Sequence, residues 1–194
     1  MSFEEHVYSV LIVSATEKFI TSVKELLSDF RFYPVDEEKS TSGARRAIAE
    51  RTYDFIVINS PLPDGDGLRF AVDTSRGKNT VVLVMVRNEL YNEVFDKVSP
   101  YGAYILPKPT SKQIITQALD WMVSTRERLR SLEEKSLSLE EKMQEIRIVN
   151  RAKWILISEL KMTENDAHRY IEKQAMDRCI SKRIMAEEII KIYT

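Results

Sequence analysis

The chain has 194 residues, 43% of them hydrophobic and 30% charged, which is enough for one ordinary domain and a smaller companion. The formal net charge is -1, but it is unevenly distributed: from Ser124 to Thr194, 15 basic residues outnumber 13 acidic ones. Between Arg147 and Thr194 the excess reaches +3. The sign of this C-terminal charge is the one that nucleic-acid binding requires, although its size alone does not establish such binding.

Cysteine usage and hydropathy exclude several classes of protein. A single cysteine, Cys179, rules out a disulfide within the chain and suits a reducing compartment. The start of the chain, MSFEEHVY, lacks the pattern of a signal peptide, and no run of about 18 apolar residues could cross a membrane. We therefore expect a cytoplasmic protein without membrane contact.

The first half alternates apolar strand patterns with amphipathic helix patterns. Strands are predicted at Val7 to Val13, Phe32 to Val35, Phe55 to Ile58, Val81 to Val86 and Tyr104 to Leu106, where Pro107 should end the last one. Helices are predicted from Glu17 to about Phe30, from Ser42 or Gly43 to Arg51, from Leu68 to Thr74 and from Leu90 to Val98. Such alternation predicts an α/β fold with a flavodoxin-like, doubly wound, five-stranded parallel sheet.

The second half is predicted to be entirely helical, because neither proline nor glycine occurs from Ser111 onward. A heptad frame that starts at Met122 places mainly apolar residues at positions a and d, which predicts a coiled coil that pairs two copies of the chain. The alternative is a long solvated helix that joins two domains. The predicted dimer contacts are Leu129, Leu132, Leu139, Met143, Ile146 and Asn150, and Asn150 would set the register.

Three short helices are predicted to follow the coiled coil as a small bundle. Thr163 should cap the second helix through a capping-box pattern with Asp166, and Ser181 should cap the third. The predicted domains are therefore residues 1–122, a coiled-coil linker at 123–146, and a three-helix domain at 147–194.

The segment from Asp54 to Leu68, DFIVINSPLPDGDGL, resembles the third strand and following loop of bacterial response-regulator receiver domains. In that family the strand ends on the aspartate that accepts a phosphoryl group, and two acids after the first strand hold Mg²⁺. The corresponding pocket residues here are Ser14, Ala15, Asn59, Met85 and Lys108. The resemblance implies a cis bond between Lys108 and Pro109. Because Mg²⁺ and phosphoryl transfer need carboxylates, it also implies a pseudo-receiver without metal or cofactor.

The C-terminal segments RAKWIL, DAHRYI, QAMDR and AEEII resemble the ANTAR domain, an RNA-binding module of bacterial transcription antiterminators. That family more often carries glycine near Ile157 or Ser158 and near Lys161 or Met162, and neither glycine is present here. Basic side chains would track phosphates, and an aromatic ring could stack on bases, although Tyr170 is more typical of a packing residue. The RNA-binding candidates are Arg151, Lys153, Arg169, Tyr170, Lys173, Arg178, Lys182 and Arg183.

Together these patterns predict a dimeric regulator of transcription antitermination that binds RNA hairpin loops and is controlled by association, for instance with a regulatory protein. Two alternatives remain open: a protein-interaction scaffold or adaptor that binds no RNA, and a DNA-binding response regulator. Enzymatic activity is not expected. The two histidines, His6 and His168, fall in different predicted domains and show no metal-ligand spacing.

Overall fold

The computed structural model describes residues 6–28, 31–77 and 79–193, and the chain divides into two compact units, residues 1–131 and 132–194. The stretch that predicts the absence of a signal peptide lies mostly outside the described residues, as does the predicted end of the first helix at Phe30. Within the described part of the chain, no helix is both long and apolar enough to cross a membrane.

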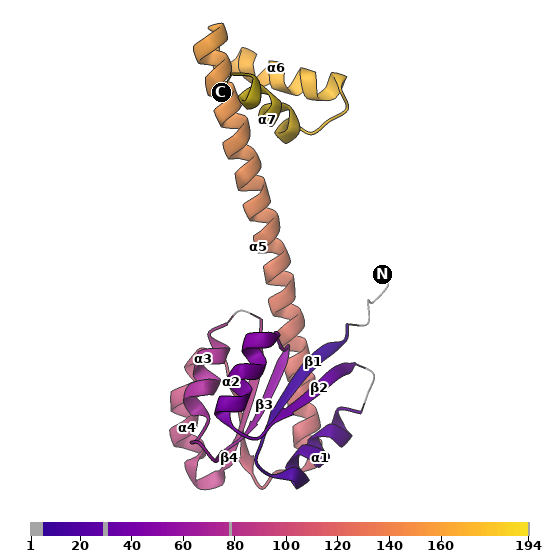
Figure 1. The fold of residues 1–194 in the computed structure, drawn as a ribbon, viewed down its shortest axis with the longest axis vertical. Coiled ribbons are helices and arrows are strands. Elements are labelled where there is room, and N and C mark those ends of the chain that lie inside the picture. Colours follow the sequence, from indigo (N-terminus) through magenta and orange to yellow (C-terminus); the bar gives the residue numbers. More distant parts are fainter. Residues whose placement is uncertain (1–5, 29–30, 78, 194) are drawn as a thin grey trace. The chain divides into compact units, whose positions relative to one another are not determined.

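Unit 1, residues 1–131, is built on a five-stranded parallel sheet in the order β2-β1-β3-β4-β5 (Figure 1). This strand order is the flavodoxin-like, doubly wound topology, so the predicted fold class is confirmed. The strands are β1 (Tyr8–Val13), β2 (Phe32–Glu38), β3 (Phe55–Asn59), β4 (Val81–Arg87) and β5 (Tyr104–Lys108).

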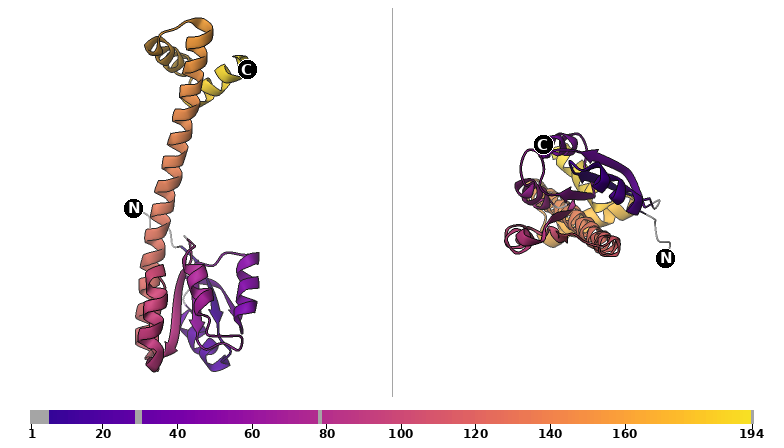
Figure 2. Two further views of the ribbon diagram at one scale, coloured as in Figure 1. Left: turned by 90° about the vertical axis from the view of Figure 1, so that its left-hand side faces the viewer. Right: turned by 90° about the horizontal axis from the view of Figure 1, so that it is seen from below.

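Helices cover both faces of this sheet, which explains why its central strands read as continuous apolar runs. On one face, α1 (Glu17–Leu26) and the first part of α5 (Lys112–Leu160) share a core with alternate residues of β1, β3 and β4. The other face is covered by α2 (Thr41–Glu50), α3 (Leu68–Ser75) and α4 (Tyr91–Val98). Figure 2 shows the start of α5 lying along its face of the sheet. Two single-turn helices, η1 (Asn88–Leu90) and η2 (Ser99–Tyr101), flank α4.

The structure corrects the predicted end of the last strand, because β5 continues through Pro107 to Lys108. Proline lacks a backbone N–H and is therefore excluded from central strands, but β5 is an edge strand with a neighbour on one side only. The cis bond between Lys108 and Pro109 that the receiver resemblance implies is present. Thr16 stands at the predicted N-cap of α1, although its side chain forms no capping hydrogen bond.

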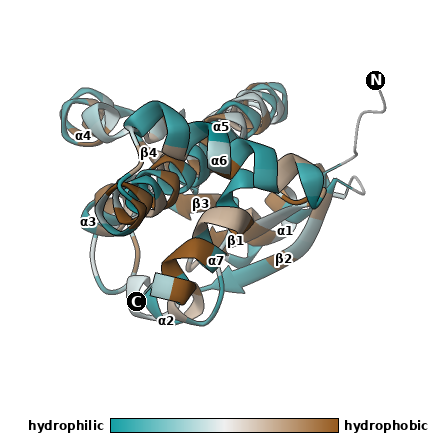
Figure 3. Cartoon of the chain, turned by 90° about the horizontal axis from the view of Figure 1, so that it is seen from above, coloured by the Kyte–Doolittle hydropathy of each residue, from teal (hydrophilic) through white to brown (hydrophobic). Residues whose placement is uncertain are grey.

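Unit 2, residues 132–194, contains the remainder of α5 together with α6 (Glu164–Asp177) and α7 (Lys182–Tyr193). Small residues let the three helices approach closely: Ala152, Ala167 and Ala186 are fully buried around Leu156 and Ile171. Both predicted caps are present, because Thr163 Oγ1 accepts from Asp166 N at 3.2 Å and Ser181 Oγ accepts from Ile184 N at 3.2 Å. In Figure 3, α6 is coloured largely hydrophilic, whereas α7 shows more of the hydrophobic colour.

The turn between α5 and α6 forms without either of the glycines that the resembled family carries. Lys161, directly after α5, adopts the left-handed conformation with φ of 55°. Cys179, exposed between α6 and α7, does the same with φ of 51°. A left-handed residue after a helix is ordinarily glycine, so these two turns carry backbone strain.

Candidate functional site

The predicted pocket residues of unit 1 meet where β1, β3 and β5 end, at the carboxyl edge of the sheet. Asn59 Nδ2 donates to Ser14 Oγ at 2.9 Å, and Lys108 Nζ donates to Asn59 Oδ1 at 2.6 Å. Lys108 Nζ also donates to the backbone oxygen of Ser60. Ser14 is fully buried, whereas Ala15 is exposed and adds no polar side chain. Asn59 therefore links the hydroxyl of Ser14 to the ammonium group of Lys108 at this edge.

Two effects lower the pKa of Lys108. Burial lowers the pKa of its ammonium group, and the charge of Arg87 lowers it further. Arg87 is the register partner of Lys108 on the neighbouring strand β4. Met85 pairs with Asn59 in the sheet and is buried in the core, so it offers no hydrogen bond. Arg87 was not among the predicted site residues, although two-residue periodicity along β4 places it on the same face as Met85.

The acidic residues near this edge serve the loop after β3. Asp64 accepts from Thr41 N at 2.9 Å and from Ser42 N at 2.8 Å at the start of α2, and these hydrogen bonds hold the pKa of its carboxyl far below its usual range. Asp66 accepts from Leu68 N at 3.0 Å at the start of α3. Among the described residues, no group of three or more His, Cys, Asp or Glu side chains could hold a metal ion.

A mostly buried ion pair anchors α5 to the start of β3 within unit 1. Arg126 Nε lies 2.9 Å from Asp54 Oδ1, and Ser9 donates its N–H and hydroxyl to Asp54 Oδ2 at 3.0 and 2.9 Å. Burial by itself would raise the pKa of Asp54. The hydrogen bonds from Ser9 and Arg126 have the larger combined effect, so the net result is a lowered pKa. Met122, one turn before Arg126, is fully buried against the sheet. This part of α5 therefore belongs to the core of unit 1.

The predicted coiled-coil residues divide into two groups. Leu129 is partly buried against the core of unit 1, so it already has apolar partners within its own chain. The remaining apolar positions lie on α5 in unit 2 with more than half of each side chain exposed, and Asn150 is also exposed: they are Leu132, Leu139, Met143 and Ile146. We call the segment from Leu132 to Asn150 the exposed seam. Its pairing with a second copy stays a prediction.

The basic RNA-binding candidates in unit 2 also fall into two groups. Four of them form ion pairs that join or stabilise the helices: Lys153 with Glu164, Arg178 with Glu188, Lys182 with Glu172, and Arg183 with Glu187. The other three, Arg151, Arg169 and Lys173, are exposed and form no ion pair with any described residue. Arg169 and Lys173 lie one turn apart on α6. The fold thus leaves these three charges open to solvent.

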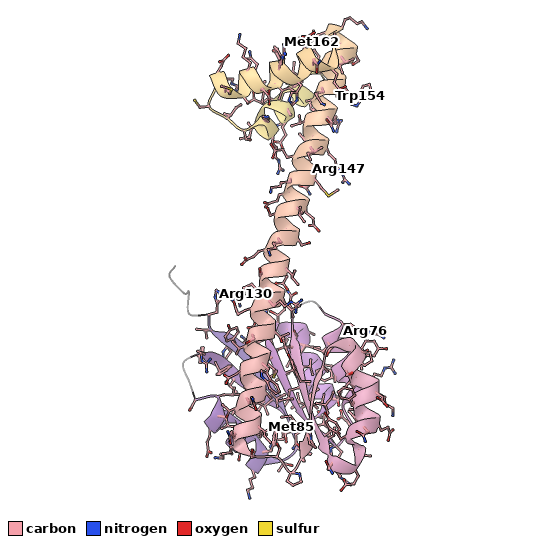
Figure 4. The ribbon with its side chains drawn as sticks, turned by 180° about the vertical axis from the view of Figure 1, so that it is seen from behind. Arg76, Met85, Arg130, Arg147, Trp154 and Met162 are labelled. Atoms are coloured by element: carbon pink, nitrogen blue, oxygen red, sulfur yellow. The ribbon has the colours of Figure 1, made fainter. Side chains whose placement is uncertain are left out.

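Two aromatic residues lie exposed in the same unit. Tyr170, next to Arg169 on α6, is 37% exposed and does not belong to the buried core. Trp154 is 71% exposed, and Figure 4 shows it with Arg147 on the side of α5 that faces away from α6 and α7. Neither Trp154 nor Arg147 was among the predicted site residues. A helical wheel centred on Ala152 and Leu156 would have placed both on the outer face.

One family model matches the C-terminal segment. Residues 137–190 match the ANTAR domain, and this match begins within the segment that was predicted as a linker. The chain is 27% identical over 139 residues to the transcriptional regulatory protein PdtaR of Mycobacterium tuberculosis, covering 71% of this chain and 67% of that protein.

Solved structures of receiver domains share the fold of unit 1. The signal receiver domain of an HD domain-containing protein from Pseudomonas fluorescens superposes with a TM-score of 0.57 at 18% identity, covering 69% of this chain and 96% of that one. The chemotaxis response regulator CheY4 of Vibrio cholerae gives a TM-score of 0.52 at 18% identity, with 60% and 98% of the two chains covered. The chain therefore joins a unit with the receiver fold to a segment that matches the ANTAR domain.

Proposed function

We propose that this chain is an RNA-binding regulator of transcription antitermination that acts as a dimer on RNA hairpins. The observation that carries the proposal is the set of exposed, unpaired cations Arg151, Arg169 and Lys173 within the segment that matches the ANTAR domain. Cations that the fold leaves unpaired keep their full charge for phosphates, and exposed aromatic rings such as Tyr170 can stack on unpaired bases of a loop. A hairpin held in this way would prevent the competing terminator fold.

Unit 1 would not be switched by phosphorylation. Mg²⁺ requires hard oxygen ligands, and the pocket offers the neutral side chains of Ser14 and Asn59 instead of carboxylates. Lys108, whose charge would otherwise pair with a phosphoryl group, already bonds to Asn59 and to the oxygen of Ser60. Incubation with acetyl phosphate and Mg²⁺ should leave the mass of the intact chain unchanged, and a stable adduct on any aspartate would contradict this part of the proposal.

Control would then come from association, either with a second copy through the exposed seam or with a regulatory protein. Four apolar side chains of the seam lie exposed on one helix, and an apolar heptad of this kind is stabilised when a second helix covers it. A cytoplasmic location accompanies this proposal, because nascent RNA is available there and the single cysteine forms no disulfide within the chain.

The experiment that tests the proposal compares the unpaired cations with the paired ones. The double variant Arg169→Gln/Lys173→Gln should bind a hairpin-loop RNA at least tenfold more weakly, with a smaller salt dependence, because phosphate contacts are lost from both copies. The matched control is Arg178→Gln/Lys182→Gln, which removes two cations that carboxylates already neutralise. Equal binding by the two double variants would count against the proposed surface.

A protein-interaction scaffold remains the second candidate, favoured by exposed apolar side chains on unit 1. Phe95 on α4 and Trp121 on α5 are both more than two-fifths exposed. They lie on helices that cover opposite faces of the sheet, so each would contribute to a separate docking surface. A chain that purifies without nucleic acid and binds hairpin RNA no better at low salt than at high salt would favour this reading.

A further inference from the structure

The exposed seam is flanked by charged side chains at heptad positions e and g. With Met143 and Asn150 at position a, Lys135 and Lys142 fall at g, and Glu140 and Arg147 fall at e. All four side chains are exposed, and none forms an ion pair with a described residue. Their charges are therefore available to a second helix, and residues at e and g set the orientation and strength of helix pairing.

Between one heptad and the next, the charge pairs across the seam change from attractive to repulsive. In a parallel, in-register pair, a residue at g lies beside the residue at e of the following heptad on the other helix. Lys135 then meets Glu140 of the second copy, which is attractive. One heptad later, Lys142 meets Arg147 of the second copy, which is repulsive. The first pair favours parallel dimerisation and the second opposes it.

Few nearby groups relieve this repulsion. The residues three and four positions from Arg147 are Met143, Gln144, Asn150 and Arg151, none of which is a carboxylate. Glu145 lies three positions after Lys142 but forms no ion pair with it among the described residues. Asn150 at the following position a is polar, so no apolar side chain there compensates for the repulsion. Lys142 and Arg147 therefore form the repulsive pair of the seam.

We infer that the paired seam ends in two cation pairs, one on each flank and each formed by Lys142 of one copy and Arg147 of the other, and that this cluster binds the phosphate backbone of RNA. The inference rests on the proposed function, because the cluster exists only in the dimer. A single chain presents Lys142 and Arg147 on opposite flanks of the seam, whereas two chains bring them side by side.

Binding of a polyanion to this cluster would couple two equilibria. RNA phosphates neutralise the repulsion between Lys142 and Arg147, so RNA strengthens the dimer, and by linkage dimerisation strengthens RNA binding by the same factor. Arg147 lies on the face of α5 that points away from α6 and α7 (Figure 4), so the small bundle does not cover it. Trp154, two turns further on the same side, offers a stacking surface beside the phosphate contacts.

The test is a pair of charge reversals in the full chain, one in each of two g–e' pairs that lie one heptad apart. Arg147→Glu converts the repulsive pair into an attractive one, so the dimer dissociation constant in sedimentation should fall roughly three- to tenfold. Lys135→Glu converts the attractive pair into a repulsive one and should raise the constant by roughly the same factor. Both substitutions are exposed, retain good helix formers and act on the same helix, so each controls for the other.

RNA binding supplies the second readout. With a synthetic two-hairpin RNA as the probe, and protein above the dimer dissociation constant, Arg147→Glu should weaken binding at least fivefold. It should also reduce the slope of log K against log salt by about one to two, because one phosphate contact is lost from each copy. Lys135→Glu should leave RNA affinity unchanged under these conditions, because it lies outside the cluster.

A dimer that is weakened or unaffected by Arg147→Glu would overturn the inference, as would unchanged RNA affinity in that variant. A full chain that binds no RNA at any salt concentration would overturn the proposed function itself. The two failures are distinguishable, because the second is already visible in the unsubstituted chain.

Discussion

The charged site candidates of units 1 and 2 differ in their partners. In unit 1 Lys108 bonds to the side chain of Asn59 and to the backbone oxygen of Ser60 at the carboxyl edge of the sheet, and Asp54 pairs with Arg126 at the start of β3. In unit 2, Arg151, Arg169 and Lys173 are left exposed without a described ion-pair partner.

This difference locates function better than the number of charges does. A charge that is satisfied within the fold stabilises it and has little left for a ligand, whereas an unpaired exposed charge contributes little to stability and retains its field. The contrast supports the proposal that unit 1 is a structural and associating body and that the ligand-binding surface belongs to unit 2. We expect the following measurements to test this contrast, beginning with the substitution of strongest effect.

The largest effect is expected from Asp54→Ala, which removes the carboxylate that Arg126 contacts in a mostly buried position. Breaking such a pair should lower the free energy of unfolding of unit 1 by about 3 kcal/mol. The measurement is urea unfolding followed by Trp121 fluorescence in a Trp154→Phe background, since the chain has 2 tryptophans. As a control, Asp73→Ala breaks the exposed pair with Arg45 and should cost less than about 1 kcal/mol.

The same ion pair should show itself in the pH dependence of stability. The folded pKa of Asp54 lies below its unfolded value, so its contribution is fully present above the usual aspartate range and is lost as the pH falls below about 4. The stability of Asp54→Ala should therefore decline less steeply than that of the unsubstituted chain between neutral and acidic pH. If the stability of both proteins falls equally steeply with decreasing pH, the contacts of Asp54 do not lower its pKa in the folded state.

The second prediction tests whether the exposed seam pairs. Ile146→Asp places a charge where two copies would bury an isoleucine, and the dimer should weaken by about 2 kcal/mol, or roughly thirtyfold. Leu137→Asp is the matched control, because Leu137 is 61% exposed and Ile146 60%, but Leu137 lies at position b outside the seam. Similar sedimentation profiles for the two variants would exclude pairing through this face.

The third prediction concerns the strained turn after α5. Lys161→Gly should raise the stability of unit 2 by about 0.5–1 kcal/mol, because glycine adopts φ of 55° without the steric cost of a Cβ atom. Thermal unfolding followed by Trp154 fluorescence in a Trp121→Phe background would measure the gain. Ser158→Gly, within the last turn of α5, should instead destabilise by a similar amount.

The smallest effect is expected from Arg87→Gln at the edge of unit 1. Removing this charge should raise the pKa of Lys108, because Arg87 contributes to its lowering after burial. The pKa can be followed by nuclear magnetic resonance of the lysine side chain. Arg76→Gln, a cation that is stacked over Tyr101 on the same unit, should leave it unchanged. An unaltered pKa in Arg87→Gln would mean that burial alone perturbs Lys108.

Much of the fold was predictable because its signals are local. Continuous apolar runs such as Val81 to Val86 need burial on both faces, and strands of this kind alternating with helices imply a parallel sheet. Thr163 and Ser181 marked helix starts through side-chain geometry that involves only three or four neighbouring residues. Pro107 misled the prediction, because its effect depends on whether the strand has one neighbour or two, and sequence order does not give the order in the sheet.

The residue types alone fix which chemistry is present: neutral side chains at Ser14 and Asn59, an apolar heptad, and basic residues at the C-terminal end. Which charges remain available follows from the packing of the helices. Lys182 and Lys173 have similar local sequence. Lys182 on α7 pairs with Glu172 on α6, whereas Lys173 forms no ion pair within the described residues. Ion pairing depends on distances between residues far apart in the chain, and those distances exist only after the helices have packed.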